Sequence, residues 1–267
     1  MIEFWTLGTF TLRTSDGRTC SKLLARPKCL AILAYLAVAA HSRLIARDTL
    51  LALFWPELDE SHARLALRQV VHILRRELGP GVLVSPGNMI GLAPNYVWCD
   101  AVAFEAALSA GHDLLALELY RGDFLPGMIL TGGLEFDLWL CRERSRLKTK
   151  ASAAAWTVSE EMESARAETH AVFWARRAIE LAPYDEPGVR RLMALLDRVG
   201  DRAGAVRVYD EFQRMMETEY QITPSSGTIA LADQIRARSQ RVPSTQRVLW
   251  IGVSGLLARV PSWLALA

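Results

Sequence analysis

The residues best suited to a chemical role share one face of a predicted helix over residues 61–78. Projected at 100° per residue, this segment separates into an apolar face and a polar face. The polar face carries Ser61, Arg64, Leu65, Arg68, Gln69, His72, Arg75 and Arg76. The planar fork of an arginine can grip a phosphate or bond guanine O6 and N7, and an apolar side chain such as Leu65 can contact a thymine methyl. This face is therefore a candidate for binding in the major groove of DNA.

An arginine-rich helix face taken alone is more often a solvated surface, so the neighbouring elements decide between the two interpretations. The front of the chain predicts short strands at residues 2–7 and 10–14, where β-prone residues cluster. Asp16-Gly17, a pair that favours a tight turn, follows the second run. Apolar residues then recur at helical spacing and predict helices at 27–40 and 47–54. The polar face thus belongs to the third helix of a small α+β unit.

The boundaries of that third helix and the segment after it complete the pattern. Ser61 offers an N-cap, and Gly79-Pro80 ends the helix. Apolar runs at 83–85 and 89–92 then flank Pro86-Gly87-Asn88, which predicts a hairpin. Strands, three helices and a terminal hairpin together indicate a winged helix-turn-helix, and this placement favours groove binding over a merely solvated face.

Four residues outside the third helix are secondary candidates. Arg43 and Arg47 flank the start of the second helix, where each could contact a phosphate or act as an ordinary helix-end charge. Trp55-Pro56 lies in the loop that follows, where winged-helix activators meet partner proteins. For Trp55 the favoured interpretation is packing in the core at the end of the helix.

The rear half predicts helices alone. Strand signals disappear beyond residue 100, and amphipathic segments follow one another up to about residue 238. Three positions at helical spacing, Ala171, Ala175 and Ala178, recur 34 residues later as Ala205, Tyr209 and Phe212. Because 34 residues is the tetratricopeptide period, this half predicts stacked helical hairpins with a groove. The front half is basic and the rear half acidic, which suits polyanion binding by the first and protein contacts by the second.

No enzyme, cofactor or metal site is expected. The chain contains no GxxxxGK[ST], GxGxxG, HExxH or GxSxG motif, so no residue is a candidate for catalysis. The histidines show no ligand spacing to cysteines or carboxylates, and the four cysteines lie far apart with no CxxC pair. This cysteine usage fits a reducing cytoplasm.

The two ends of the chain also predict a cytoplasmic protein. The first residues contain neither a basic leader nor an apolar run of the kind that directs secretion. Residues 241–267 form an apolar tail of unknown role, whose uncharged stretch at 248–258 is too short to cross a bilayer. We expect a docked or loosely held tail, and no membrane contact.

The ordered motifs of both halves resemble the Streptomyces antibiotic regulatory protein family. The front half contributes Arg26-Pro27-Lys28, Phe54-Trp55-Pro56 and Ala63-Arg64-x2-Leu67-Arg68. The rear half contributes Tyr120-Arg121-Gly122-Asp123-Phe124-Leu125 and Pro183-Tyr184-Asp185-Glu186. The resemblance implies an α+β winged helix-turn-helix of the OmpR type at residues 1–98. It implies an all-α, tetratricopeptide-like bacterial transcriptional activator domain at residues 99–240.

The resemblance further implies a transcriptional activator that binds repeated elements of double-stranded DNA near promoters and helps to recruit RNA polymerase. The helical domain would serve oligomerisation or partner contacts. We expect phosphate contacts to supply most of the affinity, and Arg64, Arg68, Gln69 and His72 to supply the specificity. Two alternatives stay open: a helical interaction scaffold whose front domain has lost its affinity for DNA, and a membrane-tethered regulator held by its tail.

Overall fold

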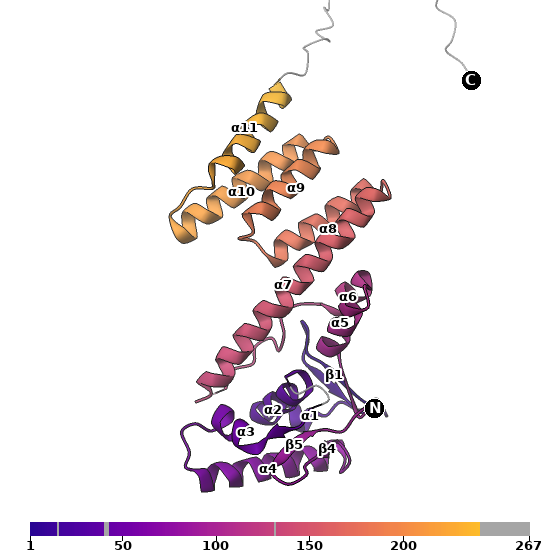
Figure 1. Ribbon diagram of the computed structural model, residues 1–267, viewed down its shortest axis with the longest axis vertical. Coiled ribbons are helices and arrows are strands. Elements are labelled where there is room, and N and C mark those ends of the chain that lie inside the picture. The colour runs from indigo at the N-terminus through magenta and orange to yellow at the C-terminus, as the bar shows by residue number, and fades with distance from the viewer. Residues whose placement is uncertain (15, 40–42, 131, 241–267) are drawn as a thin grey trace, which may run out of the picture.

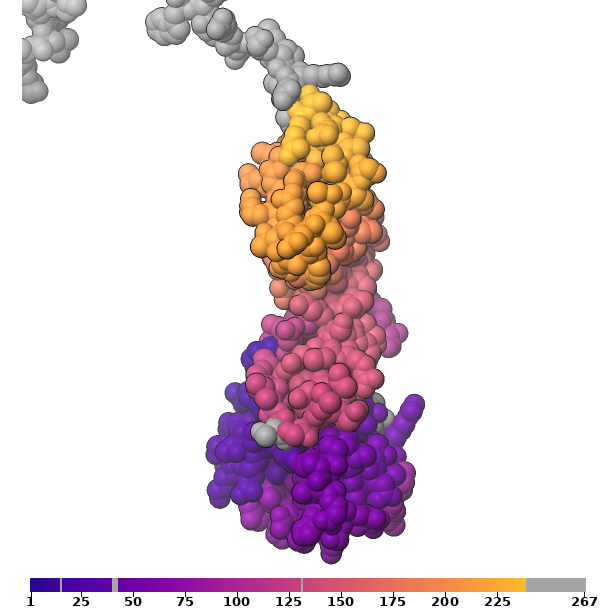
Figure 2. Space-filling view, turned by 90° about the vertical axis from the view of Figure 1, so that its left-hand side faces the viewer, coloured from indigo at the N-terminus to yellow at the C-terminus, as the bar shows by residue number. Residues whose placement is uncertain are grey.

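A computed structural model of the chain describes residues 1–14, 16–39, 43–130 and 132–240. The molecule is elongated, with the strands and helices of the front half at one end and stacked helices at the other (Figure 1). One long helix runs between them, and Figure 2 shows that its beginning lies directly on the front half. The order of elements confirms the predicted fold class, an α+β winged helix followed by an all-α domain.

The first sheet of the front half joins the beginning of the chain to the start of the rear half. Strand β1 (Ile2–Trp5) pairs antiparallel with β2 (Thr11–Arg13) and parallel with β6 (Val97–Cys99). The strands predicted at 2–7 and 10–14 are confirmed, with shorter bounds. Strand β6 was not predicted, because three residues are too few to show an alternating pattern.

The second sheet carries the wing. Strand β5 (Met89–Leu92) lies between β3 (Ile45–Ala46) and β4 (Leu83–Val84), and both pairings are antiparallel. The predicted hairpin after the third helix is therefore confirmed as β4 and β5. Strand β3, which leads straight into the second long helix of the front half, was not predicted.

The helices of the front half are α1 (Ser21–Leu24), α2 (Pro27–Val38), α3 (Arg47–Phe54) and α4 (Glu60–Leu78). The last three match the predicted helices, and the single turn of α1 is an addition. The predicted N-cap of the third helix was wrong. Asp59 is the cap, since its side chain accepts hydrogen bonds from the backbone nitrogens of Ser61 and His62 at 3.1 and 3.2 Å.

In the described residues that follow β6, the rear half consists of helices joined by loops. Its helices are α5 (Asp100–Ser109), α6 (Asp113–Leu119), α7 (Leu134–Ser164), α8 (Glu168–Leu181), α9 (Glu186–Arg198), α10 (Arg202–Tyr220) and α11 (Ser226–Gln240). Helix α7 has 31 residues, which corresponds to about 46 Å. It continues without a break through the acidic residues Glu160, Glu161 and Glu163 and ends at Ser164.

The 34-residue recurrence marks the positions where the repeat helices pack. All six residues, Ala171, Ala175, Ala178, Ala205, Tyr209 and Phe212, are buried. Small residues let α8 approach α7 closely enough for two serine hydroxyls of α7 to reach its backbone. The Oγ atoms of Ser152 and Ser159 donate to the carbonyls of Ala178 and Ala171, both at 2.9 Å. The helices therefore stack as pairs, as the repeat period predicted.

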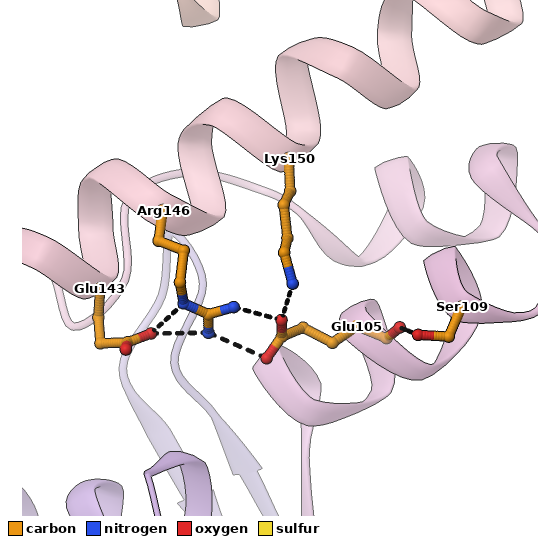
Figure 3. A network of polar contacts seen from close by, with 5 residues as sticks. All are labelled: Glu105, Ser109, Glu143, Arg146 and Lys150. Carbon is orange, nitrogen blue, oxygen red and sulfur yellow. Dashed lines mark hydrogen bonds and ion pairs between the residues drawn. The ribbon is translucent and has the colours of Figure 1, made fainter.

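A charged network ties the first helical pair to α7 (Figure 3). The guanidinium of Arg146 lies 2.5 Å from Glu105 and 2.7 Å from Glu143, and Lys150 also contacts Glu105. The hydrogen bond from Arg146, assisted by Lys150, lowers the pKa of Glu105 to about 2. The folded state therefore favours the ionised carboxylate more than the unfolded state does. This contribution to stability is fully present above the ordinary glutamate pKa and is lost as the pH falls towards 2.

We expect Glu105→Gln to lower the thermal unfolding midpoint at pH 7, and the difference from the wild type to shrink as the pH is lowered from about 5 to about 2. The reason is that the wild type loses the same ion pairs on protonation. Scanning calorimetry across this pH range measures the effect, and Glu118→Gln on the exposed side of α6 is a matched control. A difference that stays constant with pH would contradict the assignment.

The two halves share one continuous hydrophobic core across the predicted boundary at residue 98. Aromatic rings join them, since Phe54 of α3 lies 5.2 Å from Phe136 of α7, and Tyr35 of α2 lies 4.9 Å from Trp139, measured between ring centroids. Arg144 of α7 donates to the backbone carbonyl of Phe124 at 2.7 Å, which fixes the segment before α7. The winged helix and the helical domain are therefore packed together rather than loosely linked.

A buried carboxylate holds the junction. Asp100, the first residue of α5, is fully buried and accepts four hydrogen bonds from nitrogen and oxygen donors, besides a longer one of 3.9 Å from the Cys99 thiol. The donors are the backbone nitrogen of Thr6 at 2.8 Å, its hydroxyl at 2.6 Å, and the backbone nitrogens of Leu7 and Ala101, both at 2.9 Å. Burial raises the pKa of Asp100, while these donors oppose that shift by favouring the charged form. The side chain thus satisfies backbone groups that follow β1.

Next to this carboxylate, two backbone segments approach each other at Gly8. Its φ is +71°, and a Cβ placed there would lie 2.6 Å from the carbonyl carbon of Arg121 and 2.7 Å from the nitrogen of Gly122. The nitrogen of Gly8 donates to the carbonyl of Asp123 at 3.0 Å. Only glycine combines this backbone conformation with so close an approach.

In the part of the chain that the structure describes, no helix has the length and apolar character needed to cross a membrane. Among those same residues, no three His, Cys, Asp or Glu side chains gather in a way that could hold a metal ion. The apolar tail at 241–267 lies outside the described residues.

Candidate nucleic-acid interface

Helix α4 forms with two distinct faces, as its sequence predicts. The apolar side chains are buried against the rest of the front half. They are Ala63, Leu67, Val70, Val71, Leu74 and Leu78. The residues predicted for the polar face that are exposed are Ser61, Arg64, Leu65, Arg68, Gln69, His72 and Arg76. The structure thus brings seven of the eight predicted residues of this face together on one solvent-accessible surface.

Arg75 is the exception, because it is half-buried. Its Nη2 atom donates to the Ser85 hydroxyl at 2.6 Å and to the carbonyl of Leu83 at 3.3 Å. It therefore fastens α4 to the β4–β5 hairpin. The 100° projection placed Arg75 on the polar face, because a hairpin that covers a side chain leaves no sign in the sequence of the helix itself.

The first turn of α4 is acidic, and Arg64 at this end of the helix forms ion pairs with two carboxylates. Arg64 lies 2.6 Å from Glu60, one turn earlier, and 3.4 Å from Asp48 at the start of α3. Hydrogen bonds from Ser61 and His62 hold the pKa of Asp59 well below its usual range. Asp59 is therefore charged at neutral pH, and the beginning of the helix presents carboxylates as well as an arginine.

The middle of α4 is different, because its polar side chains face solvent without acidic partners. Among the residues that the structure describes, Arg68 forms one hydrogen bond, a long one of 3.5 Å from Nε to the carbonyl of Arg64. Together with Gln69, His72 and Ile73, it lines a shallow open hollow of about 350 Å³. Within the described residues none of Arg68, Gln69 and His72 forms an ion pair, so their donors and acceptors are available to a ligand.

The arginines near α3 lie beside the hairpin. The backbone of Arg43 passes so close to Gly91 of β5 that a Cβ on that glycine would lie 2.7 Å from the Arg43 carbonyl oxygen, while the Arg43 side chain is exposed. Arg47 is half-buried, and its backbone nitrogen donates to the carbonyl of Asn88 at 2.9 Å. Both residues therefore lie on the hairpin side of the predicted recognition surface.

Trp55 packs in the core, as the favoured interpretation of the sequence had it. It is 6% exposed, its ring lies 6.2 Å from Phe54, and the ammonium of Lys28 lies 5.1 Å above it. Pro56 and Leu58, in contrast, are exposed beside an open hollow of about 480 Å³ between α3 and α4. Trp55 borders the same hollow, but Pro56 and Leu58 present more of their surface to solvent.

Three acidic residues of this region were missed by sequence reasoning, and so was the contact between one of them, Asp48, and the hairpin residue Asn88. Glu60 could have been found from its i,i+4 spacing to Arg64, and Asp59 from its position directly before the helix. The contact between Asp48 and Asn88 could not have been found from the sequence, because these residues are 40 positions apart and only the folded chain brings them together.

The comparisons with known proteins cover both halves. The family model described as bacterial transcriptional activator domain matches residues 99–236. Among solved structures, the chain is similar to Mycobacterium tuberculosis EmbR in complex with a low-affinity phosphopeptide, with a TM-score of 0.63 and 21% identity. The match covers 89% of this chain and 65% of the EmbR chain, so this chain spans about two thirds of that protein. No curated protein matches the chain.

Proposed function

This chain belongs to the bacterial transcriptional activator domain family, and from that premise we propose that it binds specific duplex DNA sequences through α4 and activates transcription. The observation that carries the proposal is the free polar surface of Arg68, Gln69 and His72. It lies on a helix whose opposite face is buried and whose end is fastened to a hairpin. Such a helix fits the major groove, where arginine and glutamine can read guanine and adenine.

Each candidate residue has a place in this proposal. Arg64, Leu65, Arg68, Gln69 and His72 would meet base edges. Contacts to phosphate, which position the protein without reading sequence, would come from Ser61, Arg76, Arg43 and Arg47. Arg75 would act indirectly, by holding the hairpin.

The partners follow from the same premise. We expect repeated elements of double-stranded DNA near promoters as the target, in the cytoplasm, with RNA polymerase meeting the exposed Pro56 and Leu58. The helical domain would pair subunits on adjacent repeats. Pairing would make the full chain bind two-site duplexes more tightly than one-site duplexes, through raised effective concentration.

Arg68→Ala should cost about 1–3 kcal/mol on the preferred duplex and flatten its discrimination between bases. Arg76→Ala, which removes a charge nearer the end of α4, should weaken binding to all duplexes about equally. Fluorescence anisotropy on a duplex selected from a random library, and on a shuffled duplex, measures both effects. Arg207→Ala, on the exposed face of α10, is the charge-matched control. The proposal fails if Arg68→Ala leaves the preference of the wild type intact.

A second candidate, a helical interaction scaffold, is favoured by one observation. A hollow of about 290 Å³ lies between α8, α9 and α10, with Ile179, Leu192 and Phe212 in its wall and Arg176 and Glu180 at its rim. It has the apolar wall and charged rim of a peptide groove. A salt titration separates the candidates, since affinity for duplex DNA falls steeply with salt. A folded wild type with no affinity for duplex DNA at low salt would favour the scaffold.

A further inference from the structure

The hairpin and the first turn of α4 are joined through one carboxylate at the start of α3. The side-chain amide of Asn88, at the hairpin turn, donates to Oδ2 of Asp48 at 3.0 Å. The other oxygen of Asp48 lies 3.4 Å from Nη2 of Arg64. The backbone of Asn88 is itself fixed, because its carbonyl accepts from the nitrogen of Arg47 at 2.9 Å. Asp48 therefore links two elements that would meet DNA at different places.

The carboxylates around Arg64 restrict what this guanidinium can bind. Asp48 and Glu60 both make their closest approach to the same atom, Nη2, and within the described residues Nε and Nη1 of Arg64 donate no hydrogen bond. A phosphate that approached the arginine would also approach two negative charges, which repel it. A guanine edge carries no net charge and offers two acceptors, O6 and N7, at the spacing of the arginine fork.

We propose that Asp48 is a positioning residue that reserves Arg64 for a guanine edge, and that Asn88 holds Asp48 in place from the hairpin. The inference rests on the proposed function, because it requires α4 to enter the major groove. Without the carboxylate of Asp48, the flexible arginine is free to turn towards the nearest phosphate. Such a contact adds affinity for any duplex and removes discrimination at one base pair.

The test uses the full chain and the duplex that the wild type selects from a random library, together with every single-base-pair variant of that duplex. Arg64→Ala should lower discrimination at one G·C pair about tenfold. Asp48→Asn should lower discrimination about tenfold at that same pair. It should also raise affinity for shuffled duplex severalfold and steepen the salt dependence by about one phosphate contact. Combining both substitutions should be no worse than Arg64→Ala alone, because Asp48 acts through Arg64.

Two further variants separate positioning from general electrostatics and from folding. Glu57→Gln removes an equal charge from the loop before α4, where the carboxylate lies near Gly132 instead of Arg64, and it should keep full discrimination. Asn88→Ala, which leaves every charge in place, should weaken discrimination at the same base pair as Asp48→Asn. The measurement for Asn88→Ala is the preference among duplexes, and this preference is separate from any change in the stability of α3.

The inference is overturned if Asp48→Asn keeps the discrimination of the wild type, or if its effect adds fully to that of Arg64→Ala. It is also overturned if Asp48→Asn and Glu57→Gln behave alike. In each of these outcomes the wild type still selects a sequence, so the proposed function stands. If the wild type selects no sequence at all, the proposed function fails, and the inference that depends on it fails as well.

Discussion

Asp100→Ala is expected to lower the free energy of unfolding by about 3–5 kcal/mol, the largest effect of any substitution considered for this chain. The side chain is fully buried and accepts hydrogen bonds from Thr6, Leu7 and Ala101. Alanine would leave two backbone N–H groups after β1 and one hydroxyl without an acceptor, in a place that water does not reach. Denaturant unfolding followed by circular dichroism measures the change.

Asp113→Ala is the matched control. Asp113 is also the first residue of a helix, α6, but it is only partly buried. Both substitutions remove a negative charge from a helix N-terminus, which contributes about 0.3–1 kcal/mol. Only Asp100 also accepts hydrogen bonds from backbone nitrogens that follow β1. Equal losses of stability in the two variants would show that Asp100 acts as an ordinary helix-end charge, contrary to the role assigned to it.

Gly8→Ala is expected to lower the free energy of unfolding by about 2–4 kcal/mol. Part of this loss comes from placing a side chain at a φ of +71°, and the rest from contact between the new Cβ and the backbone of Arg121 and Gly122. Because those atoms belong to the backbone, they cannot move aside without disturbing the segment before α7. The same unfolding measurement applies.

Gly17→Ala isolates the steric part of the effect. Gly17 has a φ of +78°, and a Cβ placed there has no atom within 4 Å. We expect a loss of only about 1 kcal/mol, from backbone strain alone. If the two glycine variants lose the same stability, the approach of the two halves at Gly8 is not the tight contact described.

The periodic elements of this fold could be predicted from sequence, and the joints between them could not. Helix α4 and the repeat helices show their buried faces at a spacing of 3.6 residues, so the fold class followed from pattern alone. Strands β3 and β6 have two and three residues and pair with partners far along the chain. Their existence depends on a neighbour that supplies hydrogen bonds, which no local pattern records.

The same division applies to the candidate interface. The projection of α4 correctly placed the exposed residues Arg64, Arg68 and Gln69, because helix geometry alone sets the direction of these side chains. It misplaced Arg75, which the hairpin covers, and it could not reveal that Arg64 shares its charge with Asp48. Both facts depend on the approach of a second element, so they required the structure.

The pairing of β1 with β6 also sets an order of events during synthesis. A ribosome adds roughly 5–20 residues per second, so the first strand exists for roughly 5–20 s before its parallel neighbour and Asp100 are made. Throughout that time β1 lacks one edge partner, and the nitrogens of Thr6 and Leu7 lack their acceptor. A nascent chain released before residue 100 would therefore expose an unpaired edge of β1, which can pair with other chains and promote aggregation. The sheet of the front half is completed only when translation has entered the helical half, so the two halves finish folding together.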